Sequence, residues 1–328
     1  MEDWHDLDNY LHENYLQQQQ VLLDTFLKTE SVVSSRDPIV LVTSGGTMAP
    51  LEKRLVRYID NFSTGNRGAG AAESFLQHNC HVIFLHRKGS CCPYSRCFPK
   101  DCYEIVQTWS VDQETRHLSG KYISIFEKNS EYKMDKDNGR LLEPFEKLSK
   151  AIHQGRILFL SFQTVAEYLY SLRQIAVSLS SFGKRVIIFL AAAVSDFYVP
   201  YSALPEHKIS PDYKEEDNPS SHQPYILKLE QVPKCLGLLK SNWAPDAYVV
   251  AFKLETDIHV LLEKAKKSID RYGVDVVVAN ELTSRYERVQ LVTKDKVFEK
   301  QSNEHQTMEQ VIVENILDLY CQKMRTLV

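Results

Sequence analysis

The residues with the clearest chemical potential lie in one short loop, YIDNFSTGNRGAG, at positions 58–70. The loop combines glycines, hydroxyl side chains, an asparagine and an arginine, and a helical pattern begins directly behind it. Backbone N–H groups at the start of a helix can bind a phosphate, and glycine lets the phosphate approach closely. The loop therefore predicts an anion site formed by Ser63, Thr64, Gly65, Arg67 and Gly68. The alternative is a capped helix whose small residues only allow close packing.

The glycine spacing differs from the known nucleotide fingerprints. G-N-R-G-A-G reverses the order of G-x-G-x-x-G and lies about twenty residues beyond the first predicted strand, whereas a dinucleotide fingerprint follows its strand directly. The chain also contains no G-x-x-x-x-G-K-[ST] motif. Neither a standard dinucleotide site nor a P-loop is predicted.

Two further residues suit chemistry on an acid or a phosphate: Asn61, which lies in this loop, and Lys208, which lies in a later segment. The side-chain amide of Asn61 offers two donors and one acceptor without charge, which suits the orientation of a carboxylate or carbonyl. Lys208 lies in the Pro-bearing segment SALPEHKIS, at 202–210, and a lysine there can close over negative charge. The alternatives are an asparagine that satisfies its own loop and a solvated surface lysine.

Small and polar residues also follow several predicted strands. In open α/β sheets, ligands bind outside the carboxyl ends of the strands. Each of these residues can simply mark a strand end, but together they indicate a ligand site. The candidates are Gly45, Gly46, Ala191, Ala192, Ala193, Asp196, Lys253 and Asn280.

The hydrophobic pattern alternates continuous apolar strands with amphipathic helices. This predicts an α/β fold, a doubly wound and mostly parallel sheet with helices on both faces. The expected strands are 39–47, 81–87, 156–162, 185–194, 224–229, 247–253, 274–280 and 289–294. The expected helices are 8–29, 66–78, 257–272, 308–319 and one that begins at a capping box of Thr164 and Glu167. Residues 1–38 are expected to form a helical extension and 39–328 one domain, with a polar insertion at about 89–150.

Composition limits the function classes. The net charge of −4 and pI near 6.3 give no reason to expect nucleic acid as a partner. No segment resembles a membrane span, and the acidic N-terminus resembles no targeting signal. Seven cysteines, an odd number, suit a reducing compartment, so a cytoplasmic protein is expected.

Other possible sites are weaker. Cys91, Cys92, Cys97 and Cys102 do not form paired C-x-x-C knuckles, so free thiols are favoured over zinc and no metal ligands are assigned. Tyr132 and Lys136 have the Y-x-x-x-K spacing of some reductases, but they lie in the polar stretch 127–140.

Six segments recur, in this order, in phosphopantothenoylcysteine synthetase. They are LVTSGGT, VRYIDNFSTGNRG, FLAAAVSDFYVP, PEHKI, FKLETD and VVVAN, and they extend from about residue 39 to 295. The chain therefore resembles the stand-alone eukaryotic type of that ligase. The resemblance implies a Rossmann-like fold, a homodimer and the joining of 4′-phosphopantothenate to L-cysteine through an acyl-adenylate, with ATP and Mg²⁺.

The resemblance also implies roles for individual residues. Asn61 matches the asparagine that holds the carboxyl or acyl group, and Lys208 matches the lysine that offsets charge on the α-phosphate. The loop from Ser63 to Gly68 would bind phosphate. The strand end at 191–193 and Phe252 would line the base pocket, and Asn280 would be a polar contact there.

Two departures from the bacterial type favour ATP over CTP. Bacterial members have Lys-Ile-Lys-Lys where this chain has Lys208, Ile209 and Ser210, and they carry a fused decarboxylase for which the segment before the first strand is too short. Two alternatives remain. One is a nicotinamide or flavin oxidoreductase on the same fold. The other is an inactive nucleotide-binding or regulatory protein, which the presence of Asn61 and Lys208 disfavours.

Overall fold

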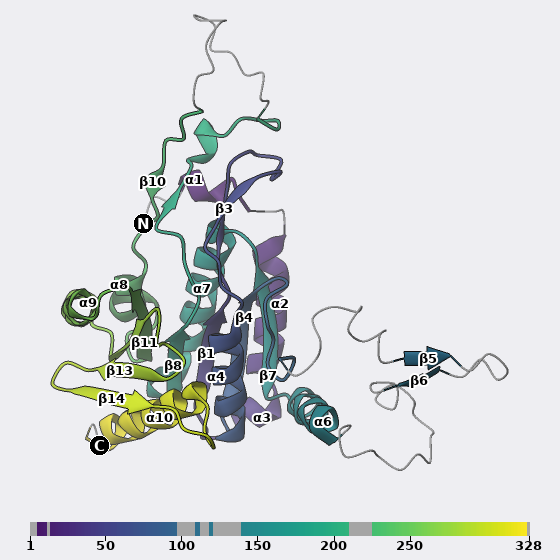
Figure 1. The fold of residues 1–328 in the computed structure, drawn as a ribbon, viewed down its shortest axis with the longest axis vertical. Coiled ribbons are helices and arrows are strands. Elements are labelled where there is room, and N and C mark those ends of the chain that lie inside the picture. The colour runs from purple at the N-terminus through teal and green to yellow at the C-terminus, as the bar shows by residue number, and fades with distance from the viewer. Residues whose placement is uncertain are drawn as a thin grey trace, which may run out of the picture.

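The centre of the fold is an eight-stranded sheet with the order β14-β13-β12-β11-β8-β1-β4-β7 (Figure 1). A computed structural model describes residues 5–11, 14–96, 109–111, 118–120, 139–209 and 225–326. The parallel strands are β1 (Ile39–Ser44), β4 (His81–Arg87), β7 (Ile157–Phe162), β8 (Val186–Leu190), β11 (Tyr248–Glu255) and β12 (Val276–Glu281). Two antiparallel strands, β13 (Arg288–Val292) and β14 (Val297–Gln301), complete one edge.

The chain order of the parallel strands reverses between β1 and β8. From β1 the sheet grows through β4 to β7, and from β8 it grows in the other direction through β11 to β12. The apolar runs of β1 and β8 are buried, as expected for a parallel sheet with both faces covered. Ligands bind at the point of such a reversal. The predicted Rossmann-like, doubly wound fold class is confirmed.

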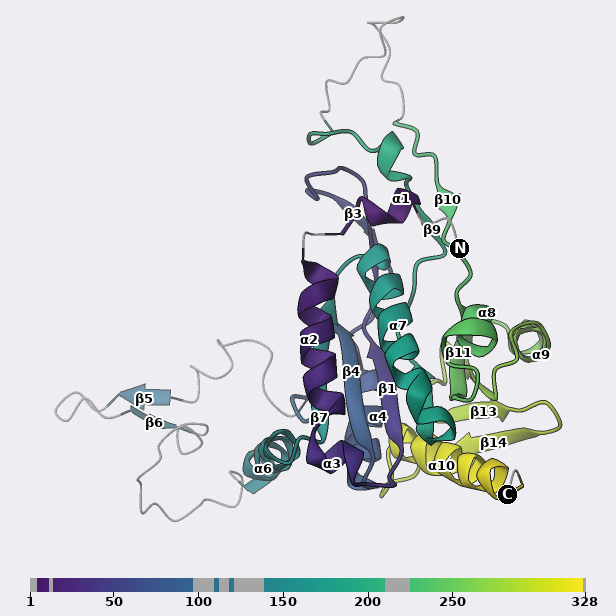
Figure 2. The ribbon, with the colours of Figure 1, turned by 180° about the vertical axis from the view of Figure 1, so that it is seen from behind.

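Helices cover both faces of the sheet. On the face seen in Figure 1, α4 (Asn66–Gln77) packs against α10 (Met308–Thr326). The opposite face, seen in Figure 2, carries α7 (Val165–Leu179), with α2 (Tyr15–Leu27) beside it. α9 (Ile258–Tyr272) packs on β11 and β12, and its Leu261 and Ala265 belong to the same core cluster as α7. None of the described helices is long and apolar enough to cross a membrane.

Local sequence signals explain where these helices begin. The Thr164 hydroxyl accepts from the Glu167 amide at 3.2 Å, and the Glu167 carboxylate accepts from the Thr164 amide at 3.1 Å. This is the predicted capping box, which satisfies two amides at the start of α7. α4 begins after Gly65, whose φ of 82° is a left-handed conformation that glycine adopts without strain.

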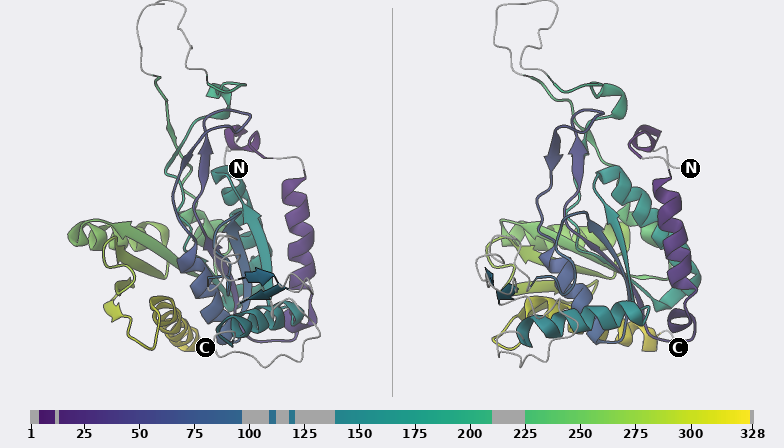
Figure 3. Two further views of the ribbon diagram at one scale, coloured as in Figure 1. Left: turned by 45° about the vertical axis from the view of Figure 1, so that its right-hand side comes forward. Right: turned by 90° about the vertical axis from the view of Figure 1, so that its right-hand side faces the viewer.

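Shorter elements complete the described chain. A hairpin of β2 (Met48–Pro50) and β3 (Tyr58–Asp60) extends beyond the sheet (Figure 3), and β9 (Phe197–Tyr198) pairs with β10 (Glu230–Gln231). The remaining strands are β5 (Trp109–Val111) and β6 (Leu118–Gly120). The remaining helices are α1 (His5–Asp8), α3 (Glu30–Val33), α6 (Gly139–His153), η2 (Ser180–Arg185), η3 (Tyr201–Ala203), α8 (Leu236–Leu238) and η4 (Leu239–Trp243).

Several expected elements differ from the structure. The strand expected at 224–229 is wrong over 225–229, because β9 offers only two residues for pairing and these pair with Glu230 and Gln231. The helix expected at 8–29 begins only at Tyr15, since Asn14 has a left-handed φ of 64°. β8 ends at Leu190 rather than at 194. Gly139 and Arg140, expected in the polar loop, begin α6.

Candidate functional site

A cleft of about 700 Å³ opens at the carboxyl ends of β8, β11 and β12 and beside the start of α4. This is the side of the sheet where the fold places a ligand. Many of the predicted site residues contribute to its lining. These are Asn61, Ser63, Thr64, Arg67, Ala191, Ala192, Ala193, Asp196, Lys253, Phe252 and Asn280. The predicted residues Gly45, Gly46, Gly65, Gly68 and Lys208 do not line it.

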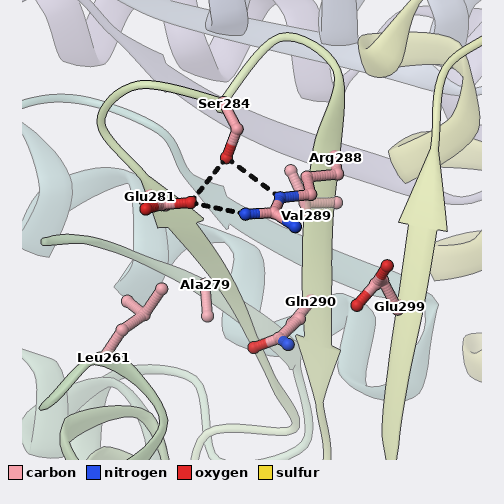
Figure 4. Close-up of a pocket in the computed structure, with 8 residues that line it drawn as sticks. All are labelled: Leu261, Ala279, Glu281, Ser284, Arg288, Val289, Gln290 and Glu299. Atoms are coloured by element: carbon pink, nitrogen blue, oxygen red, sulfur yellow. Dashed lines mark hydrogen bonds and ion pairs between the residues drawn. The ribbon is translucent and has the colours of Figure 1, made fainter. Parts of the chain in front are cut away.

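A second cavity lies beside the loop that joins β12 and β13 (Figure 4). Its volume is about 10 Å³, roughly the space of a single water and far too small for a nucleotide. At its edge, Arg288 pairs with Glu281 at 2.9 Å and donates to Ser284 at 3.2 Å. We assign this cavity a structural role.

The paired glycines after β1 allow three segments to meet. Gly45 accepts from the Ala193 amide at 2.8 Å, and the Ala193 carbonyl accepts from the Thr47 amide at 3.0 Å. The Thr47 carbonyl in turn accepts from the Asn61 amide at 3.1 Å. A Cβ at Gly46 would collide with the carbonyl of Asn61, 2.8 Å from its carbon. Gly45 and Gly46 thus let the main chains of Ala193 and Asn61 lie over the end of β1.

The glycines of the predicted phosphate loop also serve close packing. A Cβ at Gly68 would lie 2.5 Å from the Ser44 Cβ, so α4 can sit directly on the end of β1. The Ser44 hydroxyl donates to the Gly65 carbonyl at 3.0 Å. Ser63 and Thr64 accept long bonds from the amides of Gly65 and Asn66, at 3.3 and 3.4 Å. The close-packing interpretation of this loop therefore applies to its glycines, while its hydroxyls and the start of α4 border the cleft.

Arg67 is committed to protein partners. Its guanidinium pairs with Glu309 at 2.9 Å, donates to the Arg285 carbonyl, and lies 5.4 Å from the ring centroid of Tyr286. Burial lowers its pKa, although the Glu309 carboxylate opposes that effect. The expectation that Arg67 offers a free fork of donors to a phosphate does not fit this geometry. Its role is to tie α4 to α10 and to the β12–β13 loop.

Two asparagine side chains face the cleft with unused polar atoms. Asn61 is partly buried, and its side-chain amide has no hydrogen bond to any described residue. Asn280 is only 5% exposed and donates to the carbonyls of Val278, at 3.0 Å, and Lys253, at 3.4 Å. The Asn280 Oδ1 has no partner within the described structure. A buried acceptor without a partner is costly, so a ligand donor here would be favoured.

The inner wall of the cleft is apolar. Phe252 lies edge-on to Phe189 with the ring centroids 5.0 Å apart. The small side chains of 191–193 leave space beside it, which is the shape a flat nucleobase needs. Asp196 lies at the mouth, where its exposed carboxylate is 3.3 Å from the Lys234 ammonium.

Lys208 is exposed and lies outside the cleft lining, but its segment is firmly attached. The Ile209 amide donates to the buried Glu52 carboxylate at 3.2 Å, and Arg57 donates to the Ile209 carbonyl at 3.0 Å. The Lys53 amide also donates to the Pro205 carbonyl at 3.0 Å. The 52–57 loop of the β2–β3 hairpin therefore fixes where Lys208 can reach.

The structure adds little support for a site at the cysteines or at the Y-x-x-x-K pair. Cys91 and Cys92 are free thiols, and burial raises the pKa of the Cys92 thiol, which favours its protonated form. Across the described residues, no group of three or more metal-binding side chains occurs. Cys97, Cys102, Tyr132 and Lys136 lie outside the described residues.

Arg285 and Tyr286 are two of the cleft residues that the sequence did not predict. Arg285 and Tyr286 come from the β12–β13 loop and line the cleft. Ligands bind outside the carboxyl ends of the strands, and this rule identified Asn280. It also covers Arg285 and Tyr286, which follow Asn280 in the connection after β12, but the prediction extended only to residues next to the strand end.

Comparison with known proteins shows which proteins this chain is similar to. The family described as DNA/pantothenate metabolism flavoprotein C-terminal domain matches residues 171–320. Phosphopantothenate–cysteine ligase 1 of Arabidopsis thaliana is 44% identical over 253 residues, covering 76% of this chain and 71% of that protein. The Homo sapiens phosphopantothenate–cysteine ligase is 39% identical over 285 residues, covering 85% of each. A solved structure of a Cab2 mutant in complex with phosphopantothenate-cysteine has a TM-score of 0.80 at 32% identity, with 98% of both chains covered.

Proposed function

This chain belongs to the phosphopantothenate–cysteine ligase family, and we propose that it joins 4′-phosphopantothenate to L-cysteine for coenzyme A biosynthesis. The reaction would convert ATP to AMP and pyrophosphate. The observation that carries the proposal is the convergence of Asn61, the start of α4 and Asn280 on one cleft at the topological reversal of the sheet. The oxidoreductase alternative is not favoured, because the similar proteins named above are ligases and the glycine loop does not directly follow β1.

The proposed chemistry has two steps. The pantothenate carboxylate attacks the α-phosphorus of ATP, which forms an acyl-adenylate and releases pyrophosphate. The amine of cysteine then attacks the acyl carbon, releases AMP and forms the amide. The first step transfers the adenylyl group from one oxygen to another, and the second transfers the acyl group from oxygen to nitrogen, so the site must mainly orient its reactants and offset charge.

The described residues suit these tasks in different parts of the cleft. We assign Asn61 to the pantothenate carboxylate, because its amide can donate a hydrogen bond without adding a charge. Ser63, Thr64 and the start of α4 face the phosphates. Phe252 and the alanines at 191–193 border the base, and the free Asn280 Oδ1 can accept from an exocyclic amine. Adenine and cytosine both carry such an amine, so the preference for ATP rests on the family type.

Lys208 is assigned to the α-phosphate. Its long side chain starts from a segment held by Glu52 and Arg57, so it would have to bend over the cleft when substrate is bound. Lid-type closures of this kind bring a cation to the reacting phosphate only when the site is filled. Its exposed position leaves the side chain room to move over the cleft.

Mg²⁺ fits best as an ion carried by the nucleotide. The carboxylates that line the cleft are Asp196 and Glu255, and each has a lysine partner, Lys234 and Lys264 respectively. Mg²⁺ commonly binds substrate phosphates with one or two carboxylates rather than a full protein cage. When bound, it would neutralise phosphate charge. Asp196 is the more exposed of the two carboxylates and the one we assign to it.

We also propose that the enzyme is a cytoplasmic homodimer. Apolar side chains are exposed near the β2–β3 hairpin and ahead of β10, with Phe62 84% and Ile226 78% exposed. Exposed apolar groups of this kind favour a protein partner. Phe62 also lines the cleft, so a second copy bound there would approach the substrates. A monomer by sedimentation at micromolar concentration would contradict this.

The two-step chemistry can be tested without cysteine. With ATP, Mg²⁺ and phosphopantothenate, an adenylate-forming enzyme should exchange labelled pyrophosphate into ATP. The exchange should stop when phosphopantothenate is omitted. Amide formation without any such exchange would contradict a reversible adenylate step and would favour a different activated acyl group.

A further inference from the structure

Arg285 presents a guanidinium with unused donors to the cleft. It is partly buried in the loop between β12 and β13, and it lines the cleft. Its Nη1 donates to the Leu282 carbonyl at 2.8 Å, and its guanidinium lies 4.9 Å from the ring centroid of Tyr286. No carboxylate pairs with it among the residues that the structure describes. A guanidinium carries five N–H donors, so most of them remain available to a ligand.

Arg67 and Glu309 fix the position of this loop. One arm of the Arg67 guanidinium pairs with Glu309, and another donates to the main-chain carbonyl of Arg285. Arg67 lies in the first turn of α4, so Arg285 is held beside the helix start that borders the phosphate region. The loop is thus attached through its main chain, which leaves the Arg285 side chain free to bind.

Where the start of α4 meets the β12–β13 loop, the arginine side chains carry more positive charge than the neighbouring carboxylate neutralises. Two guanidiniums, Arg67 and Arg285, lie close together, and Glu309 neutralises only the first. Their proximity is reflected in Arg67, since burial lowers its pKa and the charge of Arg285 acts in the same direction. A polyanion in the cleft would relieve this repulsion. Arginine is well suited to it because its planar fork can bind two phosphate oxygens at once.

The reaction geometry indicates which phosphates lie there. In an in-line displacement the attacking oxygen and the leaving oxygen lie on opposite sides of the phosphorus. The attacking carboxylate is assigned to Asn61, which follows β3, whereas Arg285 precedes β13. Ser63, Thr64 and the start of α4 are assigned to the phosphates, and Arg67 in that same first turn holds the main chain of Arg285. The leaving pyrophosphate is therefore assigned to the part of the cleft that the Arg285 side chain lines.

We propose that Arg285 binds the β- and γ-phosphates of the nucleotide and the pyrophosphate formed from them, and that Arg67 and Glu309 position it. This rests on the proposed ligase function and adds a binding residue to it. Arg285 touches the leaving group, while Arg67 acts only through the main chain of Arg285.

The test measures binding of inorganic pyrophosphate to the free full-length protein by calorimetry. Arg285→Gln should weaken pyrophosphate roughly 10- to 100-fold, the range for losing charge-assisted hydrogen bonds. Arg285→Lys should recover part of this loss. Inhibition by AMP, which lacks these phosphates, should stay within about twofold of the wild type.

Arg288→Gln is the matched control. It removes the same charge from the first residue of β13, directly after this loop, where Arg288 pairs with Glu281 outside the cleft (Figure 4). This variant should bind pyrophosphate as the wild type does. Equal weakening by Arg285→Gln and Arg288→Gln would overturn the proposal, because it would show a general effect of charge.

Steady-state kinetics distinguish a loss of nucleotide binding from a general loss of protein stability. Arg285→Gln should raise KM for ATP and leave KM for phosphopantothenate and the melting temperature unchanged. Arg67→Lys keeps a cation beside Glu309 but loses the second arm, so it should raise KM for ATP by a smaller factor. Unchanged pyrophosphate binding in Arg285→Gln would overturn the proposal, and unchanged KM in Arg67→Lys would overturn the positioning role. Calorimetry needs no turnover, so failure to form the amide would count against the proposed function alone.

Discussion

Gly46 lies directly against the main chain of Asn61, so closely that a Cβ on Gly46 would be 2.8 Å from the Asn61 carbonyl carbon. The backbone N–H of Asn61 also donates a hydrogen bond to the Thr47 carbonyl, which further fixes the position of the residue. The position of the asparagine assigned to the substrate carboxylate thus depends on the absence of a side chain fifteen residues earlier in the chain. Contact is made with backbone, which cannot rotate away as a side chain could.

Gly46→Ala should therefore displace Asn61 and nearly abolish activity. Overpacking of a close-packed site costs about 1–3 kcal/mol, and a clash with backbone belongs at or above the top of this range. Thermal unfolding and steady-state amide formation would measure both effects. Gly89→Asn is the control, since Gly89 has open space around it and asparagine tolerates its φ of 85°. Wild-type activity in Gly46→Ala would contradict this account of how Asn61 is positioned.

Asn61→Asp should lower kcat/KM by about 100-fold or more, because it sets a carboxylate against the carboxylate of the substrate. The melting temperature should change little, since the Asn61 side chain has no hydrogen bond to a described residue. Asn79→Asp, in the turn after α4, adds the same charge away from the cleft and serves as the control. An active Asn61→Asp enzyme would remove Asn61 from the assigned role.

Lys208→Gln should slow pyrophosphate release about 10- to 100-fold, because it removes a cation from the reacting α-phosphate. Stability should not change, as Lys208 is exposed and has no ion pair with a described residue. The control is Lys267→Gln, which removes an exposed lysine on α9 that pairs with Glu263. Single-turnover release of pyrophosphate at the wild-type rate would show that another cation serves the α-phosphate.

The hydrogen bond that holds the Lys208 segment to Glu52 should weaken in acid, when the Glu52 carboxylate becomes protonated. Burial raises the pKa of Glu52, but hydrogen bonds from Arg57 and the Ile209 amide outweigh burial and leave the pKa below its usual value of 4.5. Its contribution to the free energy of unfolding is therefore complete above about pH 4.5 and is lost as pH falls through the lower folded-state pKa.

Glu52→Gln should lower the free energy of unfolding at pH 7 by about 1–3 kcal/mol. The difference from the wild type should shrink as pH falls below about 4.5, where the wild-type carboxylate also becomes protonated. Denaturant unfolding at several pH values would measure this. A difference that is constant from pH 7 to pH 3 would mean that the carboxylate charge does not hold the segment.

The sequence predicted the layers of the fold well because the parallel strands are continuous apolar runs. β1 and β8 are recognisable from that pattern alone, and the capping box of Thr164 and Glu167 marks the start of α7. Strand ends follow long-range pairing instead. β8 stops at Leu190, and Ala193 pairs again with the chain after β1 through an isolated bridge to Gly46, formed by its hydrogen bonds with Gly45 and Thr47. No local pattern contains that information.

The sequence predicted which residues line the cleft better than it predicted which other residues they contact. Asn61, Phe252 and Asn280 were predicted as site residues, and all three line the cleft, while their roles stay predictions. Arg67 was expected to bind phosphate, but its partner Glu309 lies 242 residues away along the chain. Arg285 was missed for the same reason, since only the folded chain brings the β12–β13 loop to the start of α4.

The most direct test of the ligase assignment is turnover with defined substrates. The purified protein is incubated with phosphopantothenate, L-cysteine and Mg²⁺, with either ATP or CTP, and all products are quantified by mass spectrometry. We expect phosphopantothenoylcysteine, AMP and pyrophosphate in equal amounts, well above the yield with CTP and dependent on both organic substrates. Formation of ADP and phosphate, or no amide with either nucleotide, would contradict the account.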